Sequence, residues 1–144
     1  MREQNFSNHA RFVPGYHFVL SLLLFSGLIA SLVNLWILFN RDQYVFNAIL
    51  IVVLFISATF LFIFCRRFAI KAQDRAIRAE ENFRYFILSG KVIDERITIG
   101  QIIALRFASN EEYLSLAERA ANESLTPVEI KKAIKNWRAD NHRA

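Results

Sequence analysis

Residues 45–90 read "VFNAILIVVLFISATFLFIFCRRFAIKAQDRAIRAEENFRYFILSG", and this stretch decides the fold. Residues 45–65 carry no charge, and about 20 apolar residues are enough to cross the hydrocarbon core of a bilayer. From residue 66 onward the composition turns to alanine, arginine and glutamate, which favour helix. No proline or glycine interrupts the stretch before Gly90. We therefore expect one helix, membrane-spanning over residues 45–65 and continuing outside the membrane over residues 66–90, with Gly90 as its C-terminal cap.

A second apolar stretch, "HFVLSLLLFSGLIASLVNLWILF" at residues 17–39, lies just before the first. It exceeds the apolar core of about 7–15 residues of a signal peptide, and another span follows it, so we expect it to be retained. The connection, residues 40–44, is too short for anything but an antiparallel pair of helices. The predicted fold is an all-α membrane protein: a two-span helical hairpin whose second span continues into a long cytoplasmic helix, plus a small C-terminal three-helix unit.

Basic residues predict the orientation of this hairpin. The loop at residues 40–44 holds one, whereas several follow the second span directly, and membrane proteins keep most Lys and Arg on the cytoplasmic side. The loop should therefore be external, with residues 1–16 and 66–144 in the cytoplasm, where the basic residues attract anionic lipids. Aromatic residues favour the same headgroup layers. The residues expected at the two interfaces are Tyr16, His17, Trp36, Arg41, Tyr44, Arg66, Arg67, Lys71 and Arg75.

Small residues and a stripe of apolar residues mark candidate packing faces. Ser26 with Ala30, and Gly27 with Ser31, have the four-residue spacing that lets membrane helices approach closely. Beyond the membrane, an apolar stripe recurs at steps of three or four residues and, with nothing in its own chain to face, predicts contact with another helix. This stripe consists of Phe68, Ala72, Ala76, Ala79 and Phe83.

The C-terminal unit, residues 97–144, is predicted to contain three short helices. Thr98, Ser109 and Thr126 are the expected N-caps, and the last two carry a glutamate three residues on, as in a capping box. The third helix is expected over "TPVEIKKAIKNWRADN", with one apolar and one basic face. It suits a core or membrane-surface helix, a protein-binding helix or, least favoured, a DNA-reading helix. Its candidate partner-binding residues are Lys131, Lys132, Lys135 and Trp137.

The N-terminal segment, "QNFSNHARFVPGYHF" at residues 4–18, raises the question of a ligand site. Haem in a bilayer usually takes two imidazoles from facing helices, but neither span has an interior histidine. We interpret the segment as the start of the hairpin at the membrane interface. Asn8 and His9 are candidate contacts to the basic residue 66–90 helix or to a partner. Cys65 is the single cysteine, and no phosphate-binding loop is present. We expect no metal, no cofactor, no catalytic residue and no enzymatic activity.

The whole chain resembles an uncharacterised family of small bacterial membrane proteins with two transmembrane helices, a domain of unknown function. The most specific motifs are "QDRAIR", "LRFAS" and "IKKAIKNW". The resemblance implies a multi-pass protein of the bacterial inner membrane. It carries no activity and no catalytic residue.

The expected function is a non-enzymatic inner-membrane scaffold or accessory protein that presents a cytoplasmic helical interaction module, as a homo-oligomer. One alternative is a small subunit of a larger transport or respiratory membrane complex. Another is a membrane-tethered regulator that binds nucleic acid. The expected partners are the bilayer and either a second copy of the chain or other membrane proteins, with nucleic acid favoured least.

Overall fold

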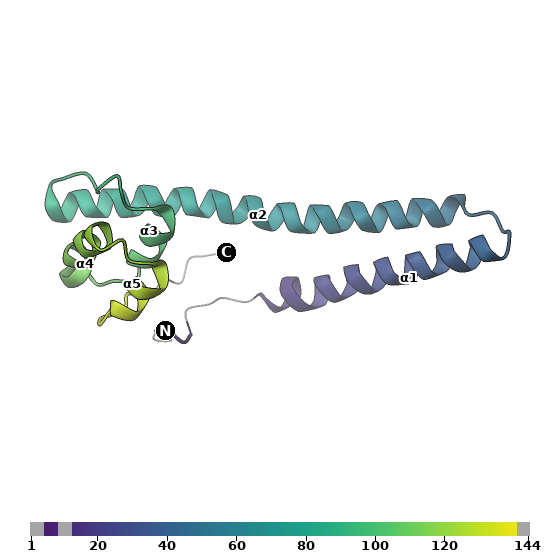
Figure 1. The fold of residues 1–144 in the computed structure, drawn as a ribbon, viewed down its shortest axis with the longest axis horizontal. Helices are drawn as coiled ribbons and strands as arrows, with labels where there is room; N and C mark the ends of the chain where they lie inside the picture. The colour runs from purple at the N-terminus through teal and green to yellow at the C-terminus, as the bar shows by residue number, and fades with distance from the viewer. Residues whose placement is uncertain (1–4, 9–12, 141–144) are drawn as a thin grey trace. The chain divides into compact units, whose positions relative to one another are not determined.

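The computed structural model describes residues 5–8 and 13–140, and this part of the chain is helical without strands (Figure 1). A π-helical turn, Gly15–Leu20 (η1), leads into α1 (Ser21–Asn40), and α2 spans Phe46–Ser89. The short helices are α3 (Ile99–Leu105), α4 (Asn110–Asn122) and α5 (Pro127–Ala133). The chain divides into two compact units: the hairpin unit, residues 13–68, and the module, residues 69–140 together with residues 5–8. The predicted all-helical class with two long apolar helices is confirmed.

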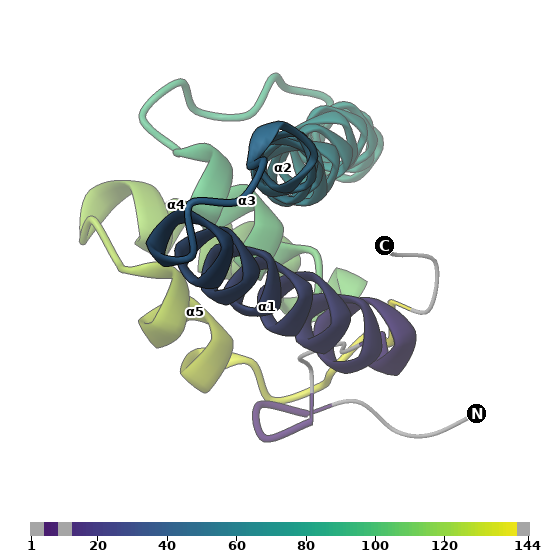
Figure 2. The ribbon, with the colours of Figure 1, turned by 90° about the vertical axis from the view of Figure 1, so that its right-hand side faces the viewer.

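In the hairpin unit, α1 and the first half of α2 run antiparallel, side by side in both views (Figures 1 and 2). The side chains withdrawn from solvent repeat at alternating steps of three and four residues, the spacing of coiled-coil packing. They include Leu24, Leu28, Ser31, Leu35 and Leu38 on α1, and Ala48, Val52, Phe55, Thr59 and Phe62 on α2. One face of each helix is therefore used within the hairpin.

The remaining faces of the hairpin are apolar and uncovered. Leu22, Phe39 and Leu54 are 70%, 71% and 66% exposed. Both helices are long and apolar enough to cross a membrane, and only 6% and 11% of their most apolar windows is buried. The core helix of a soluble protein would bury that surface, whereas the outer faces of these two helices are left exposed.

The module has its own hydrophobic core. Its largest fully buried side chains are Tyr113, Phe107, Ile102, Leu105 and Ile130. Burial of each of the last four stabilises the fold by roughly 1.5–3 kcal/mol. This core extends beyond residues 97–144, because Ile77 of α2 and Ile93 of the following loop also belong to it, and Tyr85 and Leu88 of α2 pack against it. The end of α2 is thus a structural part of the module.

The ends of the helices follow local sequence signals in most places. Gly90 ends α2 with a φ of 69°, as expected of a glycine cap. Thr98 and Thr126 begin α3 and α5 with complete capping boxes. Ser109 precedes α4 without a side-chain capping bond, so the box predicted there with Glu112 is wrong.

The third helix of the module is much shorter than the predicted one. It ends at Ala133, and Ile134 already has extended backbone with ψ 124°. The following segment forms an antiparallel bridge between Trp137 and Ala108. The Glu112 carboxylate accepts the backbone N–H groups of residues 135 and 136 at 3.1 and 3.0 Å. In a longer helix these backbone N–H groups would bond to carbonyls within the helix. Because Glu112 accepts them instead, the helix can end at Ala133 without leaving them unpaired.

Candidate functional site

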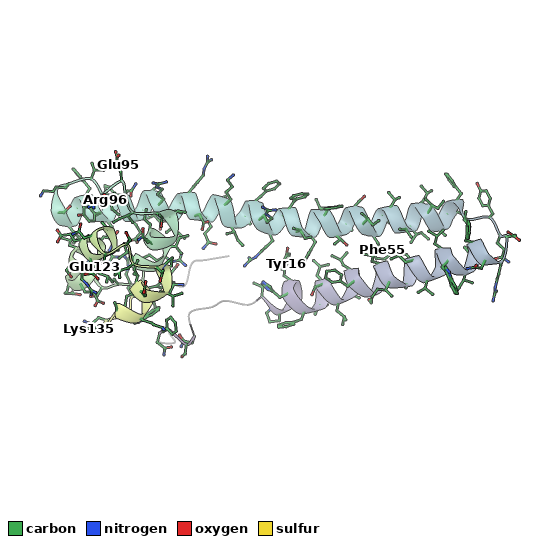
Figure 3. All side chains as sticks on the ribbon, viewed as in Figure 1. Tyr16, Phe55, Glu95, Arg96, Glu123 and Lys135 are labelled. Carbon is green, nitrogen blue, oxygen red and sulfur yellow. The ribbon has the colours of Figure 1, made fainter. Side chains whose placement is uncertain are left out.

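The two helices of the hairpin approach each other closely at Gly27. A Cβ atom at this position would lie 2.2 Å from Cε1 of Phe55, whose side chain lies between the helices (Figure 3). Ser31, four residues on, is only 6% exposed. Ser26 and Ala30 are exposed. Of the two predicted small-residue pairs, the one with Gly27 therefore packs within the hairpin, and the other does not.

At the start of the hairpin, Tyr16 joins the two helices. Its ring stacks on Phe62 with centroids 4.3 Å apart, and its hydroxyl donates to the Phe62 carbonyl at 2.5 Å. The Arg66 guanidinium lies 5.9 Å from the same ring. His17 Nδ1 accepts the backbone N–H of Val13 at 3.1 Å. Tyr16 and His17 thus have structural contacts here, while His9 lies outside the described residues.

The other predicted interface residues lie at the surface. Trp36 and Tyr44 are 67% and 79% exposed. Arg41, Arg67, Lys71 and Arg75 are exposed as well, whereas Arg66 is half-buried against Tyr16. This arrangement suits contacts with headgroups or solvent.

The apolar stripe predicted on α2 is not the face that packs against the rest of the module. Phe68 and Phe83 are 67% and 66% exposed, and Ala72, Ala76 and Ala79 are exposed too. The packing face instead contains Ile77, Glu81, Tyr85 and Leu88. Apolar periodicity does not reveal this face because it includes the charged Glu81, whereas the stripe is uniformly apolar.

Arg84 connects α2 to the beginning of α4. Its guanidinium donates to Glu81 at 3.1 Å, to the Asn110 side chain at 2.9 and 2.8 Å, and to the Ala108 carbonyl at 2.7 Å. It also lies 4.2 Å from the centre of the Tyr113 ring. Glu80, four residues before Arg84, also has the spacing of an ion pair on a helix. In the structure Arg84 pairs instead with Glu81, three residues earlier, and its other hydrogen bonds reach Ala108 and Asn110.

Tyr113 completes this cluster. Its side chain is fully buried, and its hydroxyl donates to the Glu81 carbonyl at 3.2 Å. Burial raises the pKa of the phenol far above its ordinary value of 10, and the nearby Glu81 carboxylate raises that pKa further. Tyr113 therefore stays neutral and has a structural role.

Two more buried polar side chains hold the short helices together. Gln101, 7% exposed, donates to the carbonyls of Ala120 and Leu125 at 3.2 and 2.8 Å. Arg106, 9% exposed, pairs with Asp140 at 3.0 Å and so fixes the end of the described chain. Buried polar groups need such partners to offset the loss of water.

The candidate partner-binding residues of the C-terminal segment do not share a helix face. Lys131 belongs to α5 and lies 5.7 Å from the Phe107 ring, against which Trp137 packs with centroids 5.2 Å apart. Lys135 and Trp137 follow the end of α5, and Lys135 is exposed at the edge of the module (Figure 3). The predicted basic face of one long helix is therefore wrong, because that helix ends at Ala133.

The N-terminal residues 5–8 belong to the module. The Lys132 ammonium lies 5.9 Å from the Phe6 ring. Asn8 accepts the backbone N–H of Asn5 at 2.7 Å, so its amide closes a local turn. The prediction that Asn8 and His9 contact the residue 66–90 helix or a partner stays a prediction; the contact found for this segment is that of Phe6 with α5.

Among the hollows on the module surface, two are lined by charged residues. The larger, about 640 Å³, lies between the end of α2 and the start of α4 and is lined by both signs of charge, including Glu80, Glu111 and Arg138. The smaller, about 380 Å³, lies beside Asp94 and Arg96, whose 2.6 Å ion pair lowers the pKa of Asp94 to about 2. Residues 5–8 and 13–140 contain no group of His, Cys, Asp and Glu suited to a metal ion.

Comparison with known proteins identifies the family. No match to the chain is found among curated proteins or among solved structures. One family model matches residues 1–144, and its description is "Family of unknown function (DUF6526)". The resemblance noted in the sequence is thus confirmed for the family, and the chain belongs to DUF6526, a family of unknown function.

Proposed function

We propose that this chain is a non-enzymatic scaffold or accessory protein of the bacterial inner membrane, anchored by its hairpin and presenting the module in the cytoplasm. The observation that carries this proposal is the contrast between the two units. The hairpin leaves large apolar side chains exposed on the outer faces of both helices, whereas the module closes a core of its own. The exposed apolar surface of the hairpin is suited to lipid, and the surface of the module is suited to water.

The polar residues buried in the module support the non-enzymatic part. Arg84, Gln101 and Arg106 each bond to a carbonyl, an amide or an opposite charge in another part of the module, and Glu81 pairs with Arg84 within α2. Their partners are structural, and the bonds hold a rigid surface in place. A rigid surface on a membrane anchor is suited to assembling other proteins.

The orientation is tested by cysteine labelling, because Cys65 is the single cysteine of the chain. In a Cys65→Ser background, we place one cysteine in the loop, Gln43→Cys, or one beyond α2, Val92→Cys, which is 80% exposed. A membrane-impermeant maleimide added to intact spheroplasts should label Gln43→Cys alone. Both variants should react after the membrane is opened. Labelling of Val92→Cys in intact spheroplasts would overturn the proposed topology, and release of the chain by alkaline carbonate would overturn the anchor.

The scaffold role is tested by purification of the tagged native protein from membranes in mild detergent. A defined homo-oligomer supports the scaffold. Stoichiometric copurification with subunits of a transport or respiratory complex would overturn it in favour of an accessory subunit of that complex.

A further inference from the structure

We propose that the residue 69–86 segment of α2 pairs with the same segment of a second copy of this chain as a parallel two-stranded coiled coil. The structure leaves one side of this segment uncovered. Its residues occur at alternating steps of three and four, which is the a and d pattern of a heptad repeat. These seam residues are Ala69, Ala72, Ala76, Ala79, Phe83 and Phe86, and all six are exposed.

The seam contains more than small residues. Phe83 and Phe86 are 66% and 53% exposed, and two phenylalanines on one face of a water-exposed helix lose contact with water when they pair. The alanines before them allow the two backbones to approach closely. The seam therefore offers both a driving force and room for a second helix.

The position of the seam on α2 is compatible with the fold of the module. At about 100° per residue, Ile77, Glu81 and Leu88 lie within about 40° of one another, and this is the face that the module covers. In heptad terms, Ile77 is a b position, and Glu81 and Leu88 are f positions, opposite the seam. A second α2 can therefore bind without displacing the module.

Charge complementarity identifies the second helix as a copy of the first. In this register, Arg75 is a g position and Glu80 is the e position five residues later, and parallel coiled coils pair such residues between chains. Arg75 would thus meet Glu80 of the partner subunit, twice by symmetry. Both side chains are exposed, and the ion pairs found among the described residues do not use them. Glu80 is available because Arg84 bonds to Glu81 instead.

The parallel direction rests on the proposed function, since two copies anchored by the same hairpin send their residue 69–86 segments away from the same side of the membrane. In an antiparallel pair, e positions face e positions, and the complementarity of Arg75 and Glu80 would be lost. The orientation and the charges therefore agree.

Disulfide crosslinking in native membranes tests the seam. In the full chain with Cys65→Ser, we expect Ala76→Cys and Ala79→Cys to give a dimer with mild oxidant. Arg78→Cys, a c position on the same exposed helix, is the matched control and should remain monomeric. Equal crosslinking at all three positions, or none at any of them, would overturn the seam. A crosslink to a different protein at Ala76→Cys would do the same.

Charge reversal tests the register. Arg75→Glu and Glu80→Arg each place like charges opposite each other, and each should weaken the dimer roughly tenfold. The double swap should restore it, and the two single variants should prefer each other over themselves. Arg78→Glu is the control of equal charge change and should have no effect. If the double swap fails to restore the dimer, the register is wrong.

These results separate the dimer from the anchor. Topology labelling as proposed together with no crosslink along the seam overturns the dimer and leaves the membrane anchor standing. Labelling of Val92→Cys in intact spheroplasts overturns the topology, and with it the argument for a parallel pair.

Discussion

At the scale of single residues, Arg84 is a charged side chain that is almost completely removed from solvent. Its side chain is 10% exposed and its ion-pair partner Glu81 is 8% exposed, so both charges depend on their hydrogen bonds. Breaking such a buried pair on one side leaves the other charge without compensation. By contrast, the pair between Arg119 and Glu123 is about half exposed, and pairs of that kind contribute little.

We predict that Arg84→Leu destabilises the module by about 3–5 kcal/mol. The variant also leaves Asn110 and the Ala108 carbonyl without their donor. Denaturant unfolding of the detergent-solubilised chain in a Trp36→Phe background, followed by the fluorescence of Trp137, measures the loss. Arg119→Leu is the control and should leave the midpoint unchanged. Equal midpoints for both variants would contradict the role given to Arg84.

Tyr113 makes the module sensitive to alkaline pH. Because its folded-state pKa is raised above the ordinary value of 10, its contribution to stability is full below pH 10 and is lost as the pH rises above that value. We predict that Tyr113 ionises together with unfolding of the module, seen as a late step in tyrosinate absorbance. Tyr113→Phe should remove this step, at a cost of about 1 kcal/mol at neutral pH from the lost hydrogen bond. If the late step persists in Tyr113→Phe, the step comes from another tyrosine and the prediction is wrong.

At the scale of the elements, the hairpin depends on the close approach at Gly27. A methyl group there would overlap the Phe55 ring, and overpacking of this kind costs roughly 1–3 kcal/mol. The opposite side of α1, with Ser26 and Ala30, makes no comparable contact with α2.

We predict that Gly27→Ala lowers the resistance of the hairpin to unfolding in SDS, and that Gly27→Ala with Phe55→Leu recovers part of it by making room. Circular dichroism during titration with SDS measures both. Ala30→Gly is the matched control for a small change on the exposed side of α1. If it lowers the midpoint as much as Gly27→Ala, the contact with Phe55 does not explain the effect.

At the scale of the whole molecule, the core of the module joins residues distant in sequence. Ile77 of α2 and Ile93 and Ile97 of the loop pack with the short helices. We predict that a fragment of residues 69–144 unfolds cooperatively on heating, whereas a fragment of residues 97–144 shows no transition. The shorter one lacks a wall of the core and is too small to be stable alone. A cooperative transition in residues 97–144 would show that the wall from α2 is dispensable.

The sequence alone determined the elements whose cause is local. Uninterrupted apolar runs predicted two long helices, Gly90 predicted the end of α2, and Thr98 and Thr126 predicted two helix starts. These features depend on side chains within a few residues of one another, so a sequence pattern is sufficient to find them.

Only the tertiary structure decided which faces meet. It assigned Arg84 to Glu81, ended α5 at Ala133, and turned the alanine and phenylalanine stripe of α2 away from the module. Helical periodicity indicates that an apolar face exists but not what covers it, and a partly polar face is hidden from such patterns. The contacts among residues distant in sequence make that choice, because buried charges and amides must find partners there.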